Sequence, residues 1–122
     1  MKKMFLASIA LMLLFSGLSC EQEGNDDYRL TVVVTVQDSI RVQNALVRVW
    51  VPLENSSIDE YRFTNELGEI ELKFDSPVVL DVRAGKAPYK RCSFVELKRG
   101  DNIKRMNMIP ANNDNTGCNE NP

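Results

Sequence analysis

The chain has 122 residues, of which 43% are hydrophobic and 26% are charged, and its formal net charge is −2. This size allows one domain with terminal extensions, and the mild acidity argues against a nucleic-acid-binding protein, which usually carries a basic excess. The chain contains no histidine, so the commonest general base, zinc ligand and physiological pH switch is missing.

The N-terminal segment, residues 1–19, has the organisation of a cleaved signal peptide. A short basic start precedes an uncharged apolar stretch over residues 4–18, which is shorter than the roughly 20 residues of a transmembrane helix. The segment ends in Ser-Gly-Leu-Ser before Cys20. A cysteine at this place resembles the processing site of a bacterial lipoprotein, in which Cys20 becomes the acylated, palmitate-bearing N-terminus. A plain secretory signal cleaved near Ser19 is the alternative.

Residues 20–28 are predicted to form the lipidated cysteine and a flexible acidic tether, because the segment is charged and nearly free of apolar side chains. Acidic residues directly behind a lipidated cysteine resemble the surface-export signals of Bacteroidetes lipoproteins, whereas a simple solvated spacer would look the same. We therefore expect an outer-membrane lipoprotein of the cell envelope, and both the periplasmic and the surface-exposed leaflet remain open.

The domain over residues 29–110 is rich in short alternating stretches. In the second of them Val47, Val49 and Val51 fall on one face and Trp50 on the other. Strands are predicted over residues 29–36, 46–51, 60–64, 69–74, 78–84, 92–97 and 103–109. Their spacing of roughly ten residues predicts an all-β, seven-stranded Greek-key, Ig-like β-sandwich. A small β-barrel is the competing fold.

Two of the three cysteines lie inside or after this domain. Because lipidation would use Cys20, Cys92 and Cys118 remain as a candidate disulfide in an oxidising compartment. Two separate thiols are the alternative. The polar segment over residues 111–122 is predicted to be a disordered tail unless Cys118 pins it.

Two stretches of alternating apolar residues each contain a small residue, Ala45 in the first and Gly68 in the second. They read Val42-x-x-Ala45-x-Val47-x-Val49 and Thr64-Asn65-x-x-Gly68-x-Ile70-x-Leu72-x-Phe74. Together they resemble the carboxypeptidase-regulatory-like, transthyretin-like group of sandwiches, in which the alanine packs against the opposite sheet and the Thr-x-x-x-Gly segment makes a turn. The resemblance covers residues 29–109. It implies the fold and no catalytic residue, because the group serves many functions.

Tests for chemistry find no recognised motif. The sequence has no Gly-x-Ser-x-Gly or Ser-x-x-Lys motif and no Gly-rich phosphate loop. Acidic residues near Asp59 and Glu66 are interpreted as solvated strand and loop faces rather than a calcium site. We therefore predict no enzymatic activity, no metal and no cofactor.

Three aromatic residues, Trp50, Tyr61 and Tyr89, are the candidate ligand contacts. Trp50 alternatively covers the sheet edge or packs under a loop. Eight basic residues lie between positions 83 and 105, against two acidic ones, and this asymmetry suits an anionic surface or acidic partner, although solubilising charge is the simpler interpretation.

The sequence thus predicts a non-enzymatic, lipid-anchored cell-envelope protein whose sandwich is a binding or assembly module. Its partners would be the membrane, through the lipid on Cys20, and an envelope protein or a glycan, with no role for nucleic acid. The alternative function is a carbohydrate-binding accessory domain at the cell surface, with sugars stacked on Trp50, Tyr61 and Tyr89.

Overall fold

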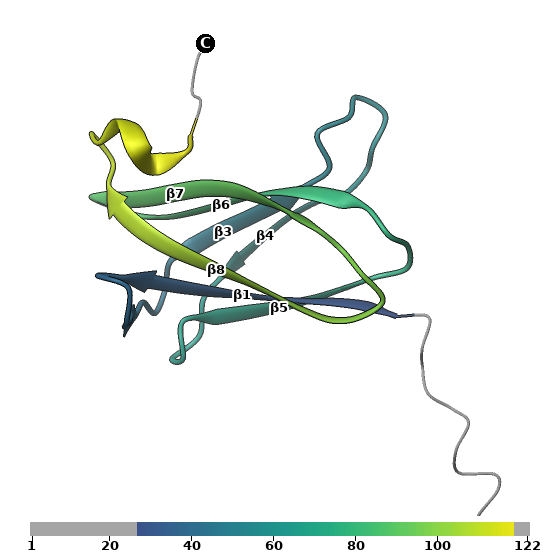
Figure 1. Cartoon of the computed structure of the whole chain (residues 1–122), viewed down its shortest axis with the longest axis horizontal. Helices are drawn as coiled ribbons and strands as arrows, with labels where there is room; N and C mark the ends of the chain where they lie inside the picture. The colour runs from purple at the N-terminus through teal and green to yellow at the C-terminus, as the bar shows by residue number, and fades with distance from the viewer. Residues whose placement is uncertain (1–26, 119–122) are drawn as a thin grey trace, which may run out of the picture.

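The computed structural model describes residues 27–118, in which eight strands and one short 3-10 helix follow each other along the chain (Figure 1). The predicted signal peptide, Cys20 and most of the tether lie outside the described residues. The elements are β1 Tyr28–Val36, β2 Ile40–Arg41, β3 Leu46–Trp50, β4 Asp59–Phe63, β5 Glu69–Phe74, β6 Val79–Lys86, β7 Tyr89–Glu96, β8 Gly100–Pro110 and η1 Asp114–Thr116. No helix in the described range combines the length and hydropathy that a membrane crossing requires.

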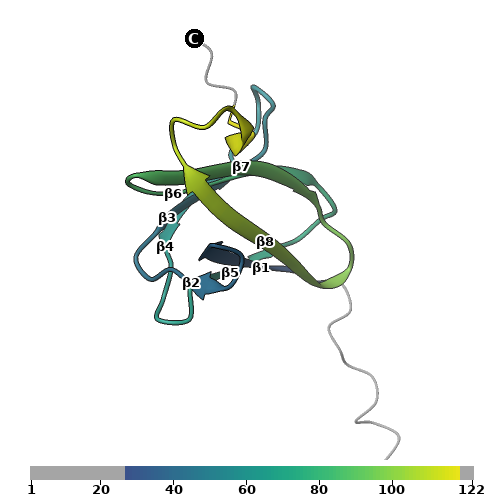
Figure 2. The ribbon, with the colours of Figure 1, turned by 60° about the vertical axis from the view of Figure 1, so that its left-hand side comes forward.

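The strands form two layers that share one edge. In the first layer, the β1 sheet, β8 runs parallel to β1 along its whole length, from the Tyr28–Gly100 pair to the Val36–Met108 pair. The antiparallel strands β5 and β2 follow each other along the opposite edge of β1. The second layer, the β6 sheet, is antiparallel in the order β7-β6-β3-β4. Because the end of β8 also pairs with the start of β7, the sheet curls over on itself (Figure 2).

The core lies between the two layers and is almost wholly aliphatic. Alternate residues of β1, β3, β6 and β8 are no more than 1% exposed: Leu30, Val32, Val34, Val47, Val49, Leu80, Val82, Met106 and Met108. Removing this apolar surface from water is the main source of the fold's stability. The all-β, sandwich-like prediction is confirmed, and so are the predicted inward faces of β1, β3 and β6.

Several strand boundaries differ from the sequence prediction by one residue, and the two largest differences are at the β6–β7 hairpin and at the start of β8. The strands predicted over residues 78–84 and 92–97 leave a loop between them, but β6 extends to Lys86 and β7 already begins at Tyr89. Only Ala87 and Pro88 therefore form the turn. At a hairpin tip, Pro88 removes no hydrogen bond from the ladder. The second difference is the start of β8, which begins at Gly100 rather than at residue 103. Its first three residues are polar or glycine, but they pair with β1.

The motif residues Ala45, Thr64 and Gly68 lie close together at the start of β3. Ala45 is fully buried, and Thr64 is 2% exposed. The Thr64 hydroxyl accepts a hydrogen bond from the Ala45 amide at 2.9 Å and donates one to the Val42 carbonyl at 2.6 Å. Gly68 has a φ of 73°, and a Cβ at this position would lie 2.9 Å from the Val34 carbonyl oxygen. Gly68 is therefore required by its positive φ and by the close approach of the Val34 carbonyl.

The C-terminal segment up to residue 118 folds against β7. Cys92 and Cys118 form the predicted disulfide, with their Cα atoms 4.8 Å apart. The Arg91 guanidinium donates to the carbonyl oxygens of Asn107 and Asn115 at 2.8 and 2.9 Å, and Thr116 of η1 is buried. The sequence predicts a disordered tail unless Cys118 holds it in place. The disulfide does hold the segment in place up to residue 118.

Candidate functional site

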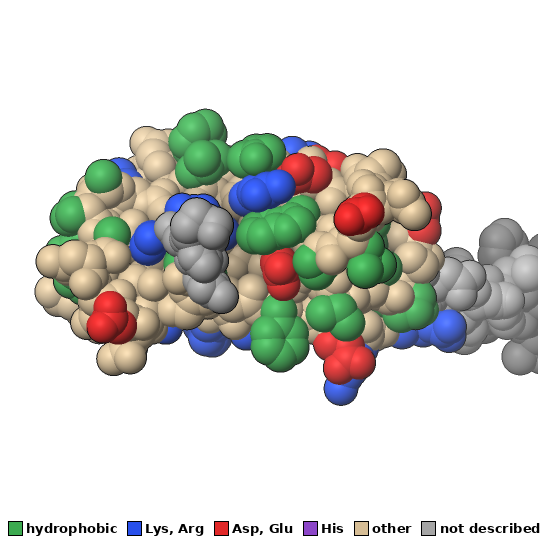
Figure 3. Space-filling model, turned by 90° about the horizontal axis from the view of Figure 1, so that it is seen from above, with side chains coloured by type: hydrophobic (Ala, Val, Ile, Leu, Met, Phe, Trp, Pro, Cys, Tyr) green, Lys and Arg blue, Asp and Glu red, His purple; other side chains and the backbone are tan. Residues whose placement is uncertain are grey.

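The face of the β6 sheet that points away from the core, called here the outer face, is unusually rich in aromatic side chains. Strand pairing places its residues in three rows across β4, β3, β6 and β7. The rows are Asp59–Trp50–Asp81–Phe94, Tyr61–Arg48–Arg83–Cys92 and Phe63–Leu46–Gly85–Lys90. Phe63, Phe94 and Tyr61 are 67, 62 and 53% exposed. Figure 3 looks onto this side of the molecule, where hydrophobic and charged side chains interleave.

Arg48 organises the centre of the outer face. Its guanidinium lies 4.2 Å from the ring centroid of Trp50 and 5.5 Å from that of Tyr61, the two aromatic neighbours on β3 and β4. It also donates two hydrogen bonds to the Asp59 carboxylate, at 2.9 and 3.0 Å. The hydrogen bond from Arg48 lowers the pKa of Asp59 below its ordinary value. This cluster orders one arginine between two rings, a pairing common in recognition surfaces.

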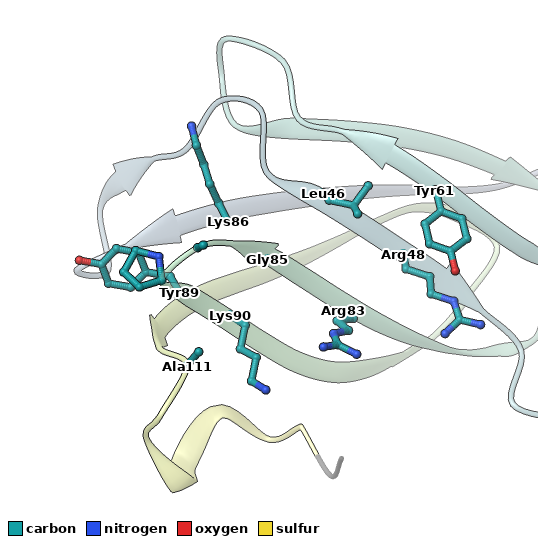
Figure 4. A pocket seen from close by; sticks show the side chains of 11 residues that line it. Leu46, Arg48, Tyr61, Arg83, Gly85, Lys86, Tyr89, Lys90 and Ala111 are labelled. Atoms are coloured by element: carbon teal, nitrogen blue, oxygen red, sulfur yellow. The ribbon is translucent and has the colours of Figure 1, made fainter. Parts of the chain in front are cut away.

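Beside this cluster lies a hollow of about 490 Å³, called here the basic groove. Among the described residues, its lining includes four basic side chains and no acidic one; the lining consists of Leu46, Arg48, Tyr61, Arg83, residues 85–90 and Ala111. Gly85 leaves the floor open, since a Cβ there would meet nothing nearer than the Tyr89 carbonyl oxygen at 3.9 Å. In Figure 4, Tyr61 and Tyr89 mark the two ends, and Arg83 and Lys90 lie between them.

The three aromatic residues predicted from the sequence do not form one stacking surface. Trp50 and Tyr61 are brought together by Arg48. Tyr89 lies at the β6–β7 hairpin, and its hydroxyl points away from Tyr61 (Figure 4). Trp50 is half-buried and also borders the loop that follows Val51. It therefore lies on the outer face and beside this loop.

Sequence reasoning missed Arg48, Phe63, Gly85 and Phe94 as parts of this surface. The two-residue alternation could have identified two of them, because residues two positions apart on a strand share a face. Phe63 follows Tyr61 by two positions, and Arg48 precedes Trp50 by two. Alternation groups residues by face, but only the strand pairing shows which face of β4 and β7 is exposed.

Three of the acidic residues around Asp59 and Glu66 are engaged in separate ion pairs. Asp59 pairs with Arg48 and Glu60 with Arg62, and Arg41 pairs with Glu69. Within residues 27–118, no group of three or more cysteine or acidic side chains converges on a point where a metal ion could bind.

The basic stretch over residues 83–105 is divided between different surfaces. Arg83, Lys86 and Lys90 line the groove. Lys98 and Arg99 are exposed in the β7–β8 loop, at the other end of β7. The groove therefore receives its charge from the part of this stretch around the β6–β7 hairpin.

Comparison of the chain with protein-family models found no match, and a search of the curated proteins found no similar sequence.

Proposed function

We propose that this chain is a non-enzymatic, lipid-anchored cell-envelope protein whose sandwich is a binding or assembly module. The outer face of the β6 sheet is the surface that it presents. The observation that carries this proposal is the exposure of Tyr61, Phe63 and Phe94 on one sheet face. Tyr61 and Phe63 lie on β4 and Phe94 lies across the face on β7. Exposed apolar side chains that share a face are typical of interaction surfaces, and aromatic residues and arginine are enriched in them.

The arrangement of the chain supports presentation away from a membrane. Figure 1 shows β1 starting at one end of the sandwich, whereas the β6–β7 hairpin lies at the opposite end. A lipid on Cys20, followed by the tether, would hold the β1 end toward the bilayer and leave the hairpin end free. Two or three acyl chains give firm attachment where one chain would not.

The binding proposal is tested by site-specific photo-crosslinking in the cells that make the protein. A photoreactive residue at Phe63 or Phe94 of the full-length protein should yield a discrete crosslinked product. Ile103 of β8, which is 63% exposed, is the matched position in the other sheet and should not. Equal products from Ile103 and the outer face, or none from the outer face, would contradict the proposal.

The anchor is tested separately. The Cys20→Ser variant should move from the membrane fraction to the soluble fraction, because it cannot be acylated. If the variant still sediments with membranes after alkaline washing, the lipid-anchor proposal is wrong.

A second candidate function, a carbohydrate-binding accessory domain, is favoured by one further observation. Tyr61 and Tyr89 are 53 and 36% exposed and border the same groove. Sugar rings stack on exposed aromatic side chains, and a groove between two of them would bind a short chain of sugars. A glycan array tests this function, and Tyr61→Ala should remove any signal that Phe94→Ala leaves.

A further inference from the structure

We propose that β5 pairs with β5 of a second copy of this chain, in a two-fold symmetric dimer that joins the two β1 sheets into one continuous sheet. This inference goes beyond the proposed binding function, because it assigns a role to a different surface of the molecule, the free edge of the β1 sheet.

Strand β5 has one free side. Within residues 27–118, β1 is the only strand that pairs with it. Successive residues of an antiparallel strand direct their N–H and C=O groups alternately toward one neighbour and toward the other side. The Gly68 carbonyl accepts a hydrogen bond from the Val34 amide at 2.8 Å. Counting from this bond, the backbone groups of Glu71 and Lys73 point to the free side.

The inner face of β5 does not oppose pairing. Edge strands are commonly protected by inward-facing charges, prolines or bulges. The inward residues of β5 are Ile70, Leu72 and Phe74, the strand contains no proline, and its register with β1 is continuous. Leu72 and Phe74 are only partly buried against the core. A neighbouring strand would bury more of both side chains and gain hydrophobic stabilisation.

The charges on β5 are self-complementary. Glu69 also faces the free side, but its N–H donates to the Asn65 side chain and its C=O accepts from the Asn65 amide, each at 3.1 Å. A two-fold axis at Leu72 places Glu71 of each copy opposite Lys73 of the other, and each such pair exchanges both backbone hydrogen bonds. An axis at Glu71 or at Lys73 would place like charges opposite each other. Self-complementarity favours a second copy over a foreign peptide, which would have to supply the same order of charges.

Both charged side chains are positioned to take part. Glu71 is exposed and makes no ion pair with another residue of the described range. The Lys73 ammonium lies 3.2 Å from the Asp27 carboxylate, and the side chain is 64% exposed. Asp27 also pairs with Arg29 at 3.5 Å. Lys73 can therefore turn toward Glu71 of the second copy without leaving Asp27 without a cation.

The dimer is compatible with the proposed anchor and with the proposed binding surface. The new strand continues the β1 sheet, so the two-fold axis is perpendicular to this sheet and the outer faces of both β6 sheets point to the same side. Tyr28 begins β1 two positions before Leu30, which pairs with Leu72. Both tethers would therefore start near the axis, where one membrane can hold both copies.

The test is disulfide crosslinking of the full-length protein in the cells that make it. In the proposed register, the two Leu72 residues face each other at a position where antiparallel Cα atoms are about 4.5 Å apart, a distance that a disulfide spans. After mild oxidation with copper phenanthroline, Leu72→Cys should give a reducible product of twice the mass. Ile103→Cys, on the 63% exposed position of β8 in the same sheet, should give none. No product from Leu72→Cys, or equal products from both variants, overturns the proposal.

Charge reversal tests the register. In the Leu72→Cys background, Glu71→Lys and Lys73→Glu each place like charges opposite each other, so each should slow crosslinking about tenfold. Co-expression of the two variants with different tags restores unlike pairs and should return the rate to within about twofold of the parent. Glu66→Lys makes the same charge change in the exposed turn before β5 and should crosslink like the parent. No recovery in the mixture, or an equal loss in Glu66→Lys, overturns the proposal.

Hydrogen exchange examines the edge without any substitution. In concentrated full-length protein in detergent, the amides of Glu71 and Lys73 should exchange about tenfold more slowly than those of Tyr61 and Phe63. The latter two point to the free side of β4, because the Thr64 amide donates to the Ala45 carbonyl. Equally fast exchange of all four amides at every protein concentration overturns the proposal.

Discussion

The Thr64 hydroxyl completes two backbone hydrogen bonds that the strand ladders leave open. The side chain is 2% exposed and bridges the Ala45 amide and the Val42 carbonyl. Thr64→Val keeps the shape but leaves both groups unpaired, so the free energy of unfolding should fall by about 2–3 kcal/mol. Urea denaturation measures this change. Thr64→Ser retains the hydroxyl and should lose about 1 kcal/mol or less, so equal stability of Thr64→Val and the wild type would contradict the assignment.

The pKa of Asp59 reports whether its carboxylate is paired with Arg48. Its pKa is lowered by the hydrogen bond from Arg48. A carboxyl group with a depressed folded pKa contributes stability above its unfolded pKa, and this contribution is lost as pH falls through the folded value. We expect carbon-detected NMR to give the Asp59 side chain a pKa below the ordinary value of an aspartate, and this pKa should return toward the ordinary value in Arg48→Met. The same titration midpoint in both proteins would show that the pair does not form in solution.

At the scale of elements, the disulfide determines whether the segment after β8 packs on β7. The bond closes a loop with a sequence separation of 26 residues, and cross-linking a loop of this length stabilises a fold by about 3 kcal/mol. Cys118→Ser should lower the free energy of unfolding by about this amount and speed hydrogen exchange in residues 111–118. Cys92→Ala/Cys118→Ala should match the single variant, because the bond acts as one unit. A larger loss in the double variant would indicate a separate packing role for Cys92.

At the scale of the whole molecule, strand β4 is an open edge of the β6 sheet. Glu60 and Arg62 lie opposite the buried Val49 and Val47, so they face inward, and they pair with each other at 3.0 Å. Inward-facing charges on an edge strand discourage another chain from extending the sheet. The aromatic outer face can therefore stay exposed without leading to sheet growth.

This interpretation predicts how the molecule associates. Glu60→Val/Arg62→Val should form concentration-dependent oligomers in sedimentation velocity experiments, because the edge becomes apolar and open to pairing. Lys98→Val/Arg99→Val also replaces two charged residues with valine, but in a loop, and should sediment like the wild type. Unchanged sedimentation of the edge variant would mean that another feature protects β4.

The agreement between sequence and structure follows from the range of the interactions involved. The strand over residues 69–74 has the predicted bounds, because a turn at Gly68 and a break after Phe74 are local signals. The hairpin at Ala87–Pro88 was predicted as a longer loop, because proline and glycine indicate a loop wherever the pairing is unknown. The two-residue strand β2 is too short to show alternation, and only its pairing with β1 defines it.

The sequence by itself determined the all-β class, the inward faces of β1, β3 and β6 and the turn at Gly68. These properties depend on the two-residue period and on local backbone geometry. Only the tertiary structure decided that β1 pairs with β8 and β3 with β6. These partners are far apart in the sequence, and their pairing reflects the packing of the whole core. The basic groove and the Arg48 cluster are consequences of that pairing, because each is assembled from side chains on neighbouring strands.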